Sequence, residues 1–178
     1  MKNKKLTTYQ MAVTAVMAAV MCVLSPLSIP IGAVPIAMAN LVICFAAWLL
    51  GPKFGTLSVV IYLLIGLIGV PVFAGYSAGV SILAGPTGGY LVGYLPLAFI
   101  GGLFIEKSNG NPVISGLGLI LGDAVCYVLG TVWFMTLTGA DLASALGWCV
   151  LPYLPGDAVK IALAAILTIQ LDKRMPNL

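Results

Sequence analysis

Uncharged hydrophobic runs dominate the chain, and they are too long to be single helices. No charged residue occurs between positions 6 and 52, or between positions 54 and 105. A helix needs about 20 mostly apolar residues to cross a bilayer, so each run has room for two such helices. Prolines and glycines break the first run at 25–35 and the second at 69–87, and Gly51-Pro52-Lys53 predicts a turn between the runs. The full pattern predicts six helices, at residues 7–24, 36–50, 55–68, 88–104, 113–137 and 156–171.

The composition is that of a protein embedded in lipid. Of the 178 residues, 61% are hydrophobic and only 7% are charged, whereas soluble domains carry about 25% charged residues. The apolar residues come in runs and do not alternate as they do in the strands of a membrane barrel. We therefore expect an all-α integral membrane protein. Residues 1–178 would form a single membrane domain, a six-helix bundle in the lipid bilayer that crosses the cell membrane several times.

The positions of the positive charges predict the orientation of the bundle. With six spans, seven cations fall on one side of the membrane, and the loops of the other side contain no Lys or Arg. These cations are Lys2, Lys4, Lys5, Lys53, Lys107, Lys173 and Arg174. Because positively charged loops stay in the cytoplasm, both termini are predicted to be cytoplasmic. The irregular connections 25–35, 70–87 and 138–155 then all lie at the outer face.

The segment from Gly66 to Tyr94 carries no charge but cannot be one helix, because glycine and proline interrupt it repeatedly. Irregular backbone in a membrane protein is tolerated only where it is buried in protein or lines a cavity. We therefore expect this segment to form one wall, and the lid, of a pocket. Its candidate ligand-binding residues are Tyr76, Ser77, Ser81, Gly85, Pro86, Thr87, Gly88, Gly89 and Tyr90.

Lys160 is the one cation that the pattern places inside a span. A charge near the centre of a membrane helix costs about 2.5–3.5 kcal/mol on insertion scales, and such residues usually face an interior or a water-filled cavity. Asp157 lies three residues earlier, on the same helix face, so the two can pair. The pair is interpreted either as a polar floor beneath the outer loops or as a structural ion pair in which Asp157 also caps its helix.

Three more polar residues are predicted within the spans. Asp123 lies near mid-membrane in the fifth helix, Tyr127 follows one turn later on the same face, and Asn40 lies one turn into the second helix. Asp123 could instead be a partner for Lys160 or a proton-relay acid, and Asn40 could make a helix–helix hydrogen bond. Together these groups suit a small ligand that has both hydrogen-bond donors and acceptors.

Several classes of chemistry are excluded. The chain has no histidine, and its four cysteines are scattered singly, so neither a metal site nor a catalytic site is expected. The sequence GPTGGY at 85–90 lacks the lysine of a phosphate-binding loop, so any ATPase must be another chain. No cofactor and no nucleic-acid partner are expected.

Small residues in the first helix suggest a packing face. Ala15 and Ala19 are spaced as in the small-xxx-small pattern that lets two membrane helices approach closely. This face could serve internal packing, or it could dock onto a separate membrane subunit.

The segment GVPVFAGYSAGVSILAGPTGGYLVGY at 69–94 resembles the signature of the BioY family, and PGDAVK at 155–160 and the alanine pair agree with it. The resemblance covers the whole chain. It implies the substrate-binding S component of an energy-coupling factor (ECF) transporter, which binds biotin from outside beneath its outer loops. It further implies a transmembrane coupling subunit and two cytoplasmic ATPase subunits as partners.

If biotin is the ligand, as the resemblance implies, its chemical groups suggest a role for each candidate residue. Asp157, assisted by Asp123, would accept the ureido N–H groups, and Lys160 would donate to the ureido oxygen or pair with the ligand carboxylate. The glycine-rich segment would wrap the ring and the tail. The alternatives are a stand-alone or proton-coupled carrier that uses Asp123 or Asp157 as its titrating acid, and a membrane assembly subunit.

Overall fold

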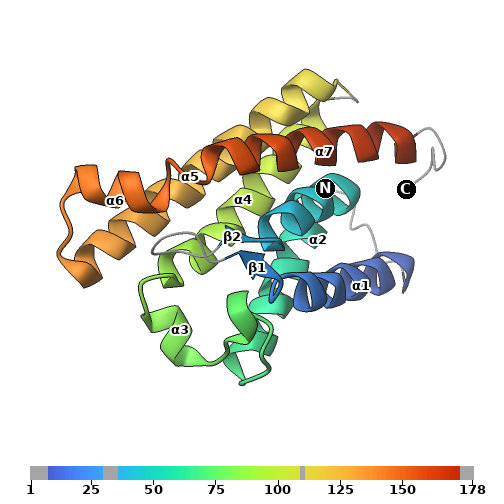
Figure 1. The fold of residues 1–178 in the computed structure, drawn as a ribbon. Helices are drawn as coiled ribbons and strands as arrows, with labels where there is room; N and C mark the ends of the chain where they lie inside the picture. Colours follow the sequence, from blue (N-terminus) through green and yellow to red (C-terminus); the bar gives the residue numbers. More distant parts are fainter. Residues whose placement is uncertain (1–7, 30–35, 109–110, 173–178) are drawn as a thin grey trace.

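The computed structural model describes residues 8–29, 36–108 and 111–172, and these form a helical bundle (Figure 1). The helices are α1 (Thr8–Leu24), α2 (Ala39–Leu67), α3 (Val80–Ala84), α4 (Gly88–Lys107), α5 (Pro112–Thr138), α6 (Leu142–Cys149) and α7 (Leu154–Asp172). A 3-10 turn, η1 (Ala74–Tyr76), precedes α3.

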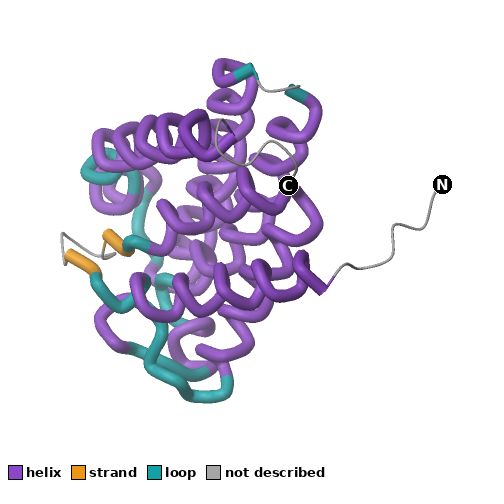
Figure 2. The backbone as a smooth tube through the Cα atoms, turned by 90° about the vertical axis from the view of Figure 1, so that its right-hand side faces the viewer, coloured by secondary structure: helices purple, strands orange, loops and turns teal. Residues whose placement is uncertain are grey.

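The all-helical prediction is confirmed, and the structure adds one small feature to it. Two short strands, β1 (Ser28–Ile29) and β2 (Ile36–Ala37), pair antiparallel in the connection between α1 and α2, with Ser28 opposite Ala37. Figure 2 shows both strands and most of the loops gathered toward one side of the molecule. The short helices α3 and α6 were not among the six predicted ranges.

Three of the described helices, α2, α4 and α5, are long and apolar enough to cross a membrane. Helix α2 is broken at Gly51, whose φ of 70° and ψ of −172° are not helical. An ideal helix places residues eight apart about 12 Å from each other. A Cβ on Gly55 would instead lie 3.0 Å from the Cα of Ala47, so the two arms of α2 fold back on each other.

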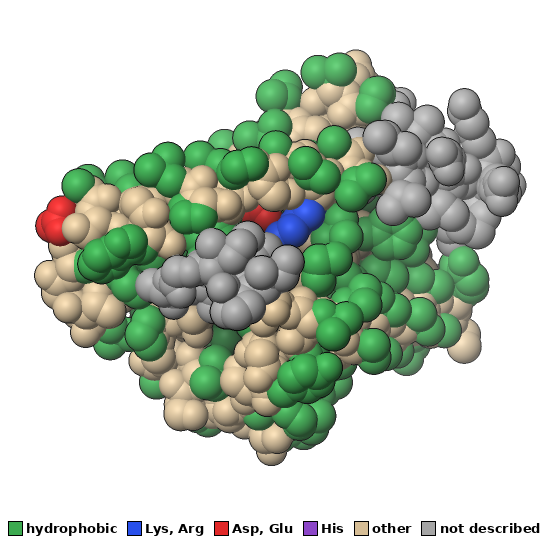
Figure 3. All heavy atoms as spheres, in the orientation of Figure 1, with side chains coloured by type: hydrophobic (Ala, Val, Ile, Leu, Met, Phe, Trp, Pro, Cys, Tyr) green, Lys and Arg blue, Asp and Glu red, His purple; other side chains and the backbone are tan. Residues whose placement is uncertain are grey.

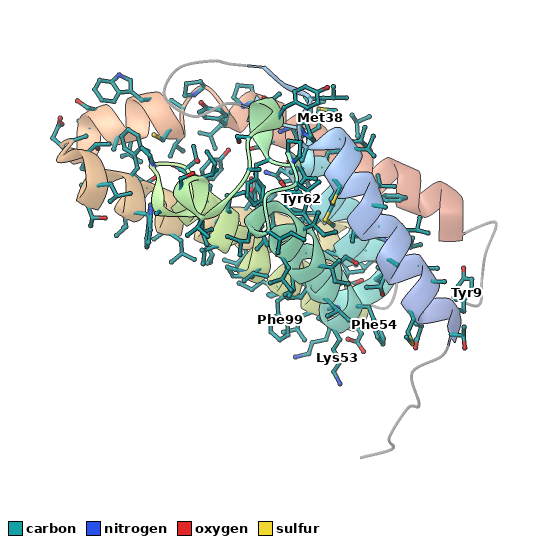
Figure 4. The ribbon with its side chains drawn as sticks, turned by 90° about the horizontal axis from the view of Figure 1, so that it is seen from below. Tyr9, Met38, Lys53, Phe54, Tyr62 and Phe99 are labelled. Carbon is teal, nitrogen blue, oxygen red and sulfur yellow. The ribbon has the colours of Figure 1, made fainter. Side chains whose placement is uncertain are left out.

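The second arm of α2 begins at Pro52, earlier than the predicted start at Gly55, because proline suits the first turn of a helix. The turn lies where Gly51-Pro52-Lys53 predicted it. Lys53 is exposed there. Figure 4 shows Lys53 and Tyr9 at one end of the bundle and Met38 at the other.

Helix α4 lies against both α2 and α5 because glycine removes the side chain at the closest contacts. A Cβ on Gly102 of α4 would lie 2.6 Å from the backbone nitrogen of Pro52 in α2. A Cβ on Gly122 of α5 would lie 2.9 Å from the carbonyl oxygen of Leu97 in α4. These close approaches, typical of membrane helices, fix the depth at which α5 presents its polar residues.

Both ends of α5 and the start of α6 follow local capping signals. The side chain of Asn111 accepts a hydrogen bond from the amide of Val113 at 3.0 Å, and Gly139 ends α5 with a left-handed φ of 69°. The carboxylate of Asp141 accepts from the amide of Ser144 at 3.2 Å at the start of α6. Helix α7 begins at Leu154, two residues before the predicted start.

The chain between α2 and η1 is held by a buried aromatic contact. Phe73, which is 1% exposed, packs edge-on against Tyr62 with ring centroids 5.7 Å apart, over the bare backbone of Gly66. The hydroxyls of Tyr62 and Ser25 share a hydrogen bond of 2.6 Å. This cluster ties the connection after α2 to the end of α1.

Candidate functional site

Polar side chains from three helices meet inside the bundle. Asn40 comes from α2, Asp123 and Tyr127 come from α5, and Asp157 and Lys160 come from α7. They are far apart in the sequence, and two sets of hydrogen bonds and the charge interactions between them bring them together. We refer to these five residues as the polar cluster.

Asp157 is the centre of the first set of hydrogen bonds. Its Oδ1 accepts from the ammonium of Lys160 at 2.9 Å, and its Oδ2 accepts from the hydroxyl of Tyr127. The side chains of Asp157 and Lys160 are only 9% and 12% exposed. Asp157 also lies in the first turn of α7, where the helix dipole favours a negative charge. The pairing predicted from the spacing of these two residues is therefore present.

Asp123 is the centre of the second set. Its Oδ1 accepts from the side-chain amide of Asn40 at 3.0 Å, and the amide oxygen of Asn40 faces the thiol of Cys44 at 3.5 Å. Asp123 also interacts electrostatically with both Asp157 and Lys160. The helix–helix hydrogen bond considered for Asn40 thus exists, and it connects α2 to a carboxylate of the cluster.

The cluster combines acceptors and donors in an apolar setting. Its two carboxylates can accept hydrogen bonds, while an ammonium, a phenol and an amide can donate them. Among the described residues, Oδ2 of Asp123 has no hydrogen-bond partner, so one carboxylate oxygen is open to a ligand N–H. Figure 3 shows an acidic and a basic side chain next to each other beneath α7, with hydrophobic side chains nearby. Such a cluster can bind a small ligand that carries both N–H groups and oxygens.

Two polar side chains of the glycine-rich segment, Tyr90 and Ser77, have partners outside the polar cluster. The hydroxyl of Tyr90 shares a 3.2 Å hydrogen bond with that of Thr131 on α5, and the Tyr90 ring lies over the backbone of Gly130. The hydroxyl of Ser77 donates to the carbonyl of Ala74 at 2.8 Å, while Tyr76 is 66% exposed. Within the described chain, none of these residues bonds to the polar cluster.

The glycines of this segment permit tight packing between protein elements. A Cβ on Gly88 would overlap the carbonyl oxygen of Leu83, and a Cβ on Gly89 would overlap the side chain of Trp133. Gly85 offers its carbonyl oxygen to the indole N–H of Trp133 at 3.0 Å. Thr87 is partly buried and Pro86 and Ser81 are exposed.

Sequence reasoning missed three residues of this region: Cys44, Thr131 and Trp133. Two of them could have been found from helical spacing. Cys44 follows Asn40 by four residues, and Thr131 follows Tyr127 by four, so each lies one turn away on the same face. Trp133 has no such signal, since its partner lies 48 positions earlier.

On α1 the small residues divide between two faces. Ala15 and Ala19 are exposed, while Ala18 is 1% exposed and packs inside. Internal packing among the described residues therefore uses Ala18, and the face that carries Ala15 and Ala19 points outward.

The long apolar helices and the enclosed polar cluster define a multi-pass protein of the plasma membrane with the features of a small-molecule binding site. Comparison with known families identifies the group. The BioY family model matches residues 1–177, so the chain belongs to the BioY family, and the resemblance seen at residues 69–94 is confirmed.

Relatives and a solved structure agree with this assignment. The chain is 36% identical to a probable biotin transporter BioY of Pyrococcus horikoshii, over 92% of this chain and 96% of that one. It is 33% identical to biotin transporter BioY2 of Lactococcus lactis, over 99% and 96%. A crystal structure of the S-component for biotin from an ECF-type ABC transporter matches with a TM-score of 0.87 at 32% identity, covering 97% of this chain and 95% of that one.

Proposed function

We propose that this protein is the high-affinity biotin-binding S component of an ATP-driven ECF importer, capturing biotin at the outer face and delivering it to the cytoplasm. The observation that carries the proposal is the enclosed polar cluster, in which Asp157, Lys160 and Asp123 supply acceptors and a donor within an apolar bundle. Biotin presents the complementary groups: two ureido N–H donors, a ureido oxygen, an apolar ring and a carboxylate. The names of the relatives and of the matching structure support the same ligand.

Within the cluster, the two carboxylates accept the ureido N–H groups. Asp123 assists Asp157 through its open Oδ2, and Tyr127 and Asn40 hold the two carboxylates in place. Lys160 donates to the ureido oxygen; the alternative is that it pairs with the ligand carboxylate. The segment from Tyr76 to Tyr90 covers the apolar ring and the tail.

The topology that goes with this function has six spans: α1, the two arms of α2, α4, α5 and α7. The fold-back of α2 at Gly51 supports counting its arms separately. The exposed Lys53 at the turn supports a cytoplasmic location for that end. Both termini are then cytoplasmic, and the outer side carries α3 and α6.

A reporter fused to the C-terminus tests this topology. We expect a reporter that works only in the cytoplasm to be active, and a reporter that works only outside to be silent. Fusion at position 141, immediately before α6, should give the reverse pattern. Outside activity of the C-terminal fusion would contradict six spans.

The partners follow from the same proposal. A transmembrane coupling subunit docks on α1, where Ala15 and Ala19 are exposed and would allow close approach of another helix. Two ATPase subunits on that partner drive release of the vitamin. A stand-alone or proton-coupled carrier is not favoured, because the matching structure is described as part of an ECF-type ABC transporter.

Competition with two analogues tests which part of the ligand is recognised. Desthiobiotin keeps the ureido group, so we expect it to displace biotin with much of the affinity retained. Lipoate lacks the ureido group and would leave the carboxylates and Lys160 unpaired, so its affinity should be lower by at least about 100-fold. The measurement is displacement of labelled biotin from the purified protein. Lipoate competing as well as desthiobiotin would contradict ureido recognition.

A further inference from the structure

Trp133 on α5 contacts both the residue that follows α3 and the first turn of α4. Its indole N–H donates to the carbonyl oxygen of Gly85 at 3.0 Å. Its Cβ lies in the space that a side chain at position 89 would need, so only glycine fits there. Trp133 remains 40% exposed, and the bond itself is solvent-accessible. It can therefore break and re-form without unfolding the bundle.

The chain before α3 is anchored. Phe73 is 1% exposed in its slot against Tyr62, and moving it would uncover a buried ring. Two backbone hydrogen bonds add to this anchor. The amide of Gly75 donates to the carbonyl oxygen of Pro26 at 3.2 Å, and the amide of Gly79 donates to the carbonyl oxygen of Gly66 at 2.8 Å. The glycine-rich segment is therefore not one mobile lid, because its first half is fixed as far as Gly79.

Helix α3 is held less tightly, because Ile82 and Leu83, which pack against the core, are only partly buried. None of its residues is buried, and Val80 is 65% exposed. Among the described residues, no side chain of α3 makes a hydrogen bond. Gly79, with a left-handed φ of 91°, lies immediately before the helix, and Gly85 lies immediately after it, so backbone rotation is easiest at its two ends. Figure 1 shows α3 at the edge of the molecule, joined to the bundle by loops.

We propose that Trp133 is a latch on α3, and that opening this latch controls the rate at which ligand enters and leaves. The proposal rests on the proposed function for the identity of the ligand, but the latch is defined by contacts within this chain. A latch of one exposed hydrogen bond changes the open population by about threefold to tenfold when it is removed. Because it acts on the gate and not on the bound ligand, it alters both rate constants together.

The test is Trp133→Phe, which keeps a ring against Gly89 and removes the N–H donor. We expect the association and dissociation rate constants of biotin, measured by stopped flow, to rise together by about threefold to tenfold, with the Kd changed by less than about twofold. Trp148→Phe is the matched control, since Trp148 is 52% exposed on α6, away from α3. Its rates should equal those of the wild type.

Hydrogen exchange tests the latch without ligand and in the unaltered chain. The amides of Val80–Ala84 should exchange faster than those of Phe73–Ser77 in the wild type, and faster still in Trp133→Phe. If the wild type bound no biotin, the proposed function would be wrong. The comparison of hydrogen exchange between the two segments would still test the latch. Equal exchange in the two segments of the wild type would overturn the latch. It would also be overturned if Trp133→Phe lowered the affinity by changing the dissociation rate constant alone.

Discussion

Replacing Lys160 with alanine should lower the affinity for biotin by about 100-fold or more. Lys160 pairs with Asp157 at 2.9 Å, and both side chains are nearly buried. In the proposed complex Lys160 donates to the ligand, and truncating one partner of a buried, hydrogen-bonded charged contact between two binding partners costs about 2–5 kcal/mol. The same change leaves Asp157 without its ammonium partner in the free protein, which lowers the stability of the fold. The measurement is equilibrium binding of biotin to the purified variant and to the wild type.

Lys107→Ala is the matched control for this change. Lys107 is exposed in the last turn of α4, a helix that contributes no residue to the polar cluster, so its removal should leave the affinity unchanged. The two roles left open for Lys160 can be separated with biotin methyl ester, which has no carboxylate charge. An equal proportional loss for both ligands assigns Lys160 to the ureido oxygen, and a loss confined to biotin assigns it to the carboxylate. Full retention of affinity in Lys160→Ala would remove this residue from the site.

Replacing Gly88 with alanine should destabilise the protein and weaken biotin binding by tenfold or more. A Cβ at this position would overlap the carbonyl oxygen of Leu83 and lie 2.6 Å from the carbonyl carbon. Both are backbone atoms, so the connection from α3 to α4 must shift. Overpacking of this kind costs about 1–3 kcal/mol and occasionally more. Thermal unfolding in detergent and biotin titration measure the two effects.

Two other glycines calibrate the effect of Gly88→Ala. A Cβ on Gly85 would lie 3.1 Å from the carbonyl oxygen of Ser81, which a shift of a few tenths of an ångström relieves, so Gly85→Ala should have a small effect. Gly116 in α5 has open space around it. Gly116→Ala should be neutral or slightly stabilising, because alanine favours helix over glycine. If Gly88→Ala behaved like Gly116→Ala, the close packing of α4 on the end of α3 would not matter for binding.

The sequence could predict those features that follow from the length of the apolar runs and from the spacing of charged residues along a helix. Long apolar runs locate the helices, and the i, i+3 spacing of Asp157 and Lys160 predicts their ion pair. Asp123 could be identified as a candidate because a carboxylate in an apolar helix needs a partner. The identity of that partner, Asn40 of α2, could not be derived, since it lies 83 positions away and no local pattern connects them.

The roles of the glycines were the hardest feature to predict from the sequence. The same residue allows a backbone to approach a ligand, a turn to close or two helices to touch, and only the three-dimensional contacts distinguish these roles. Gly88 and Gly89 pack against Leu83 and Trp133. Tyr90, one residue later, bonds to Thr131 between α4 and α5. The segment predicted as one wall and the lid of a pocket thus divides into an anchored part around Phe73 and a peripheral helix, α3, which is followed by the hydrogen bond from Trp133 to Gly85.

The most direct test of the account is a calorimetric titration of biotin into the purified wild-type protein, without any partner subunit. The account predicts saturable binding of one biotin per chain, with an affinity that Asp157→Ala and Lys160→Ala each reduce strongly. A folded, monodisperse sample that binds no biotin would contradict it, and so would one whose affinity is the same in both variants as in the wild type.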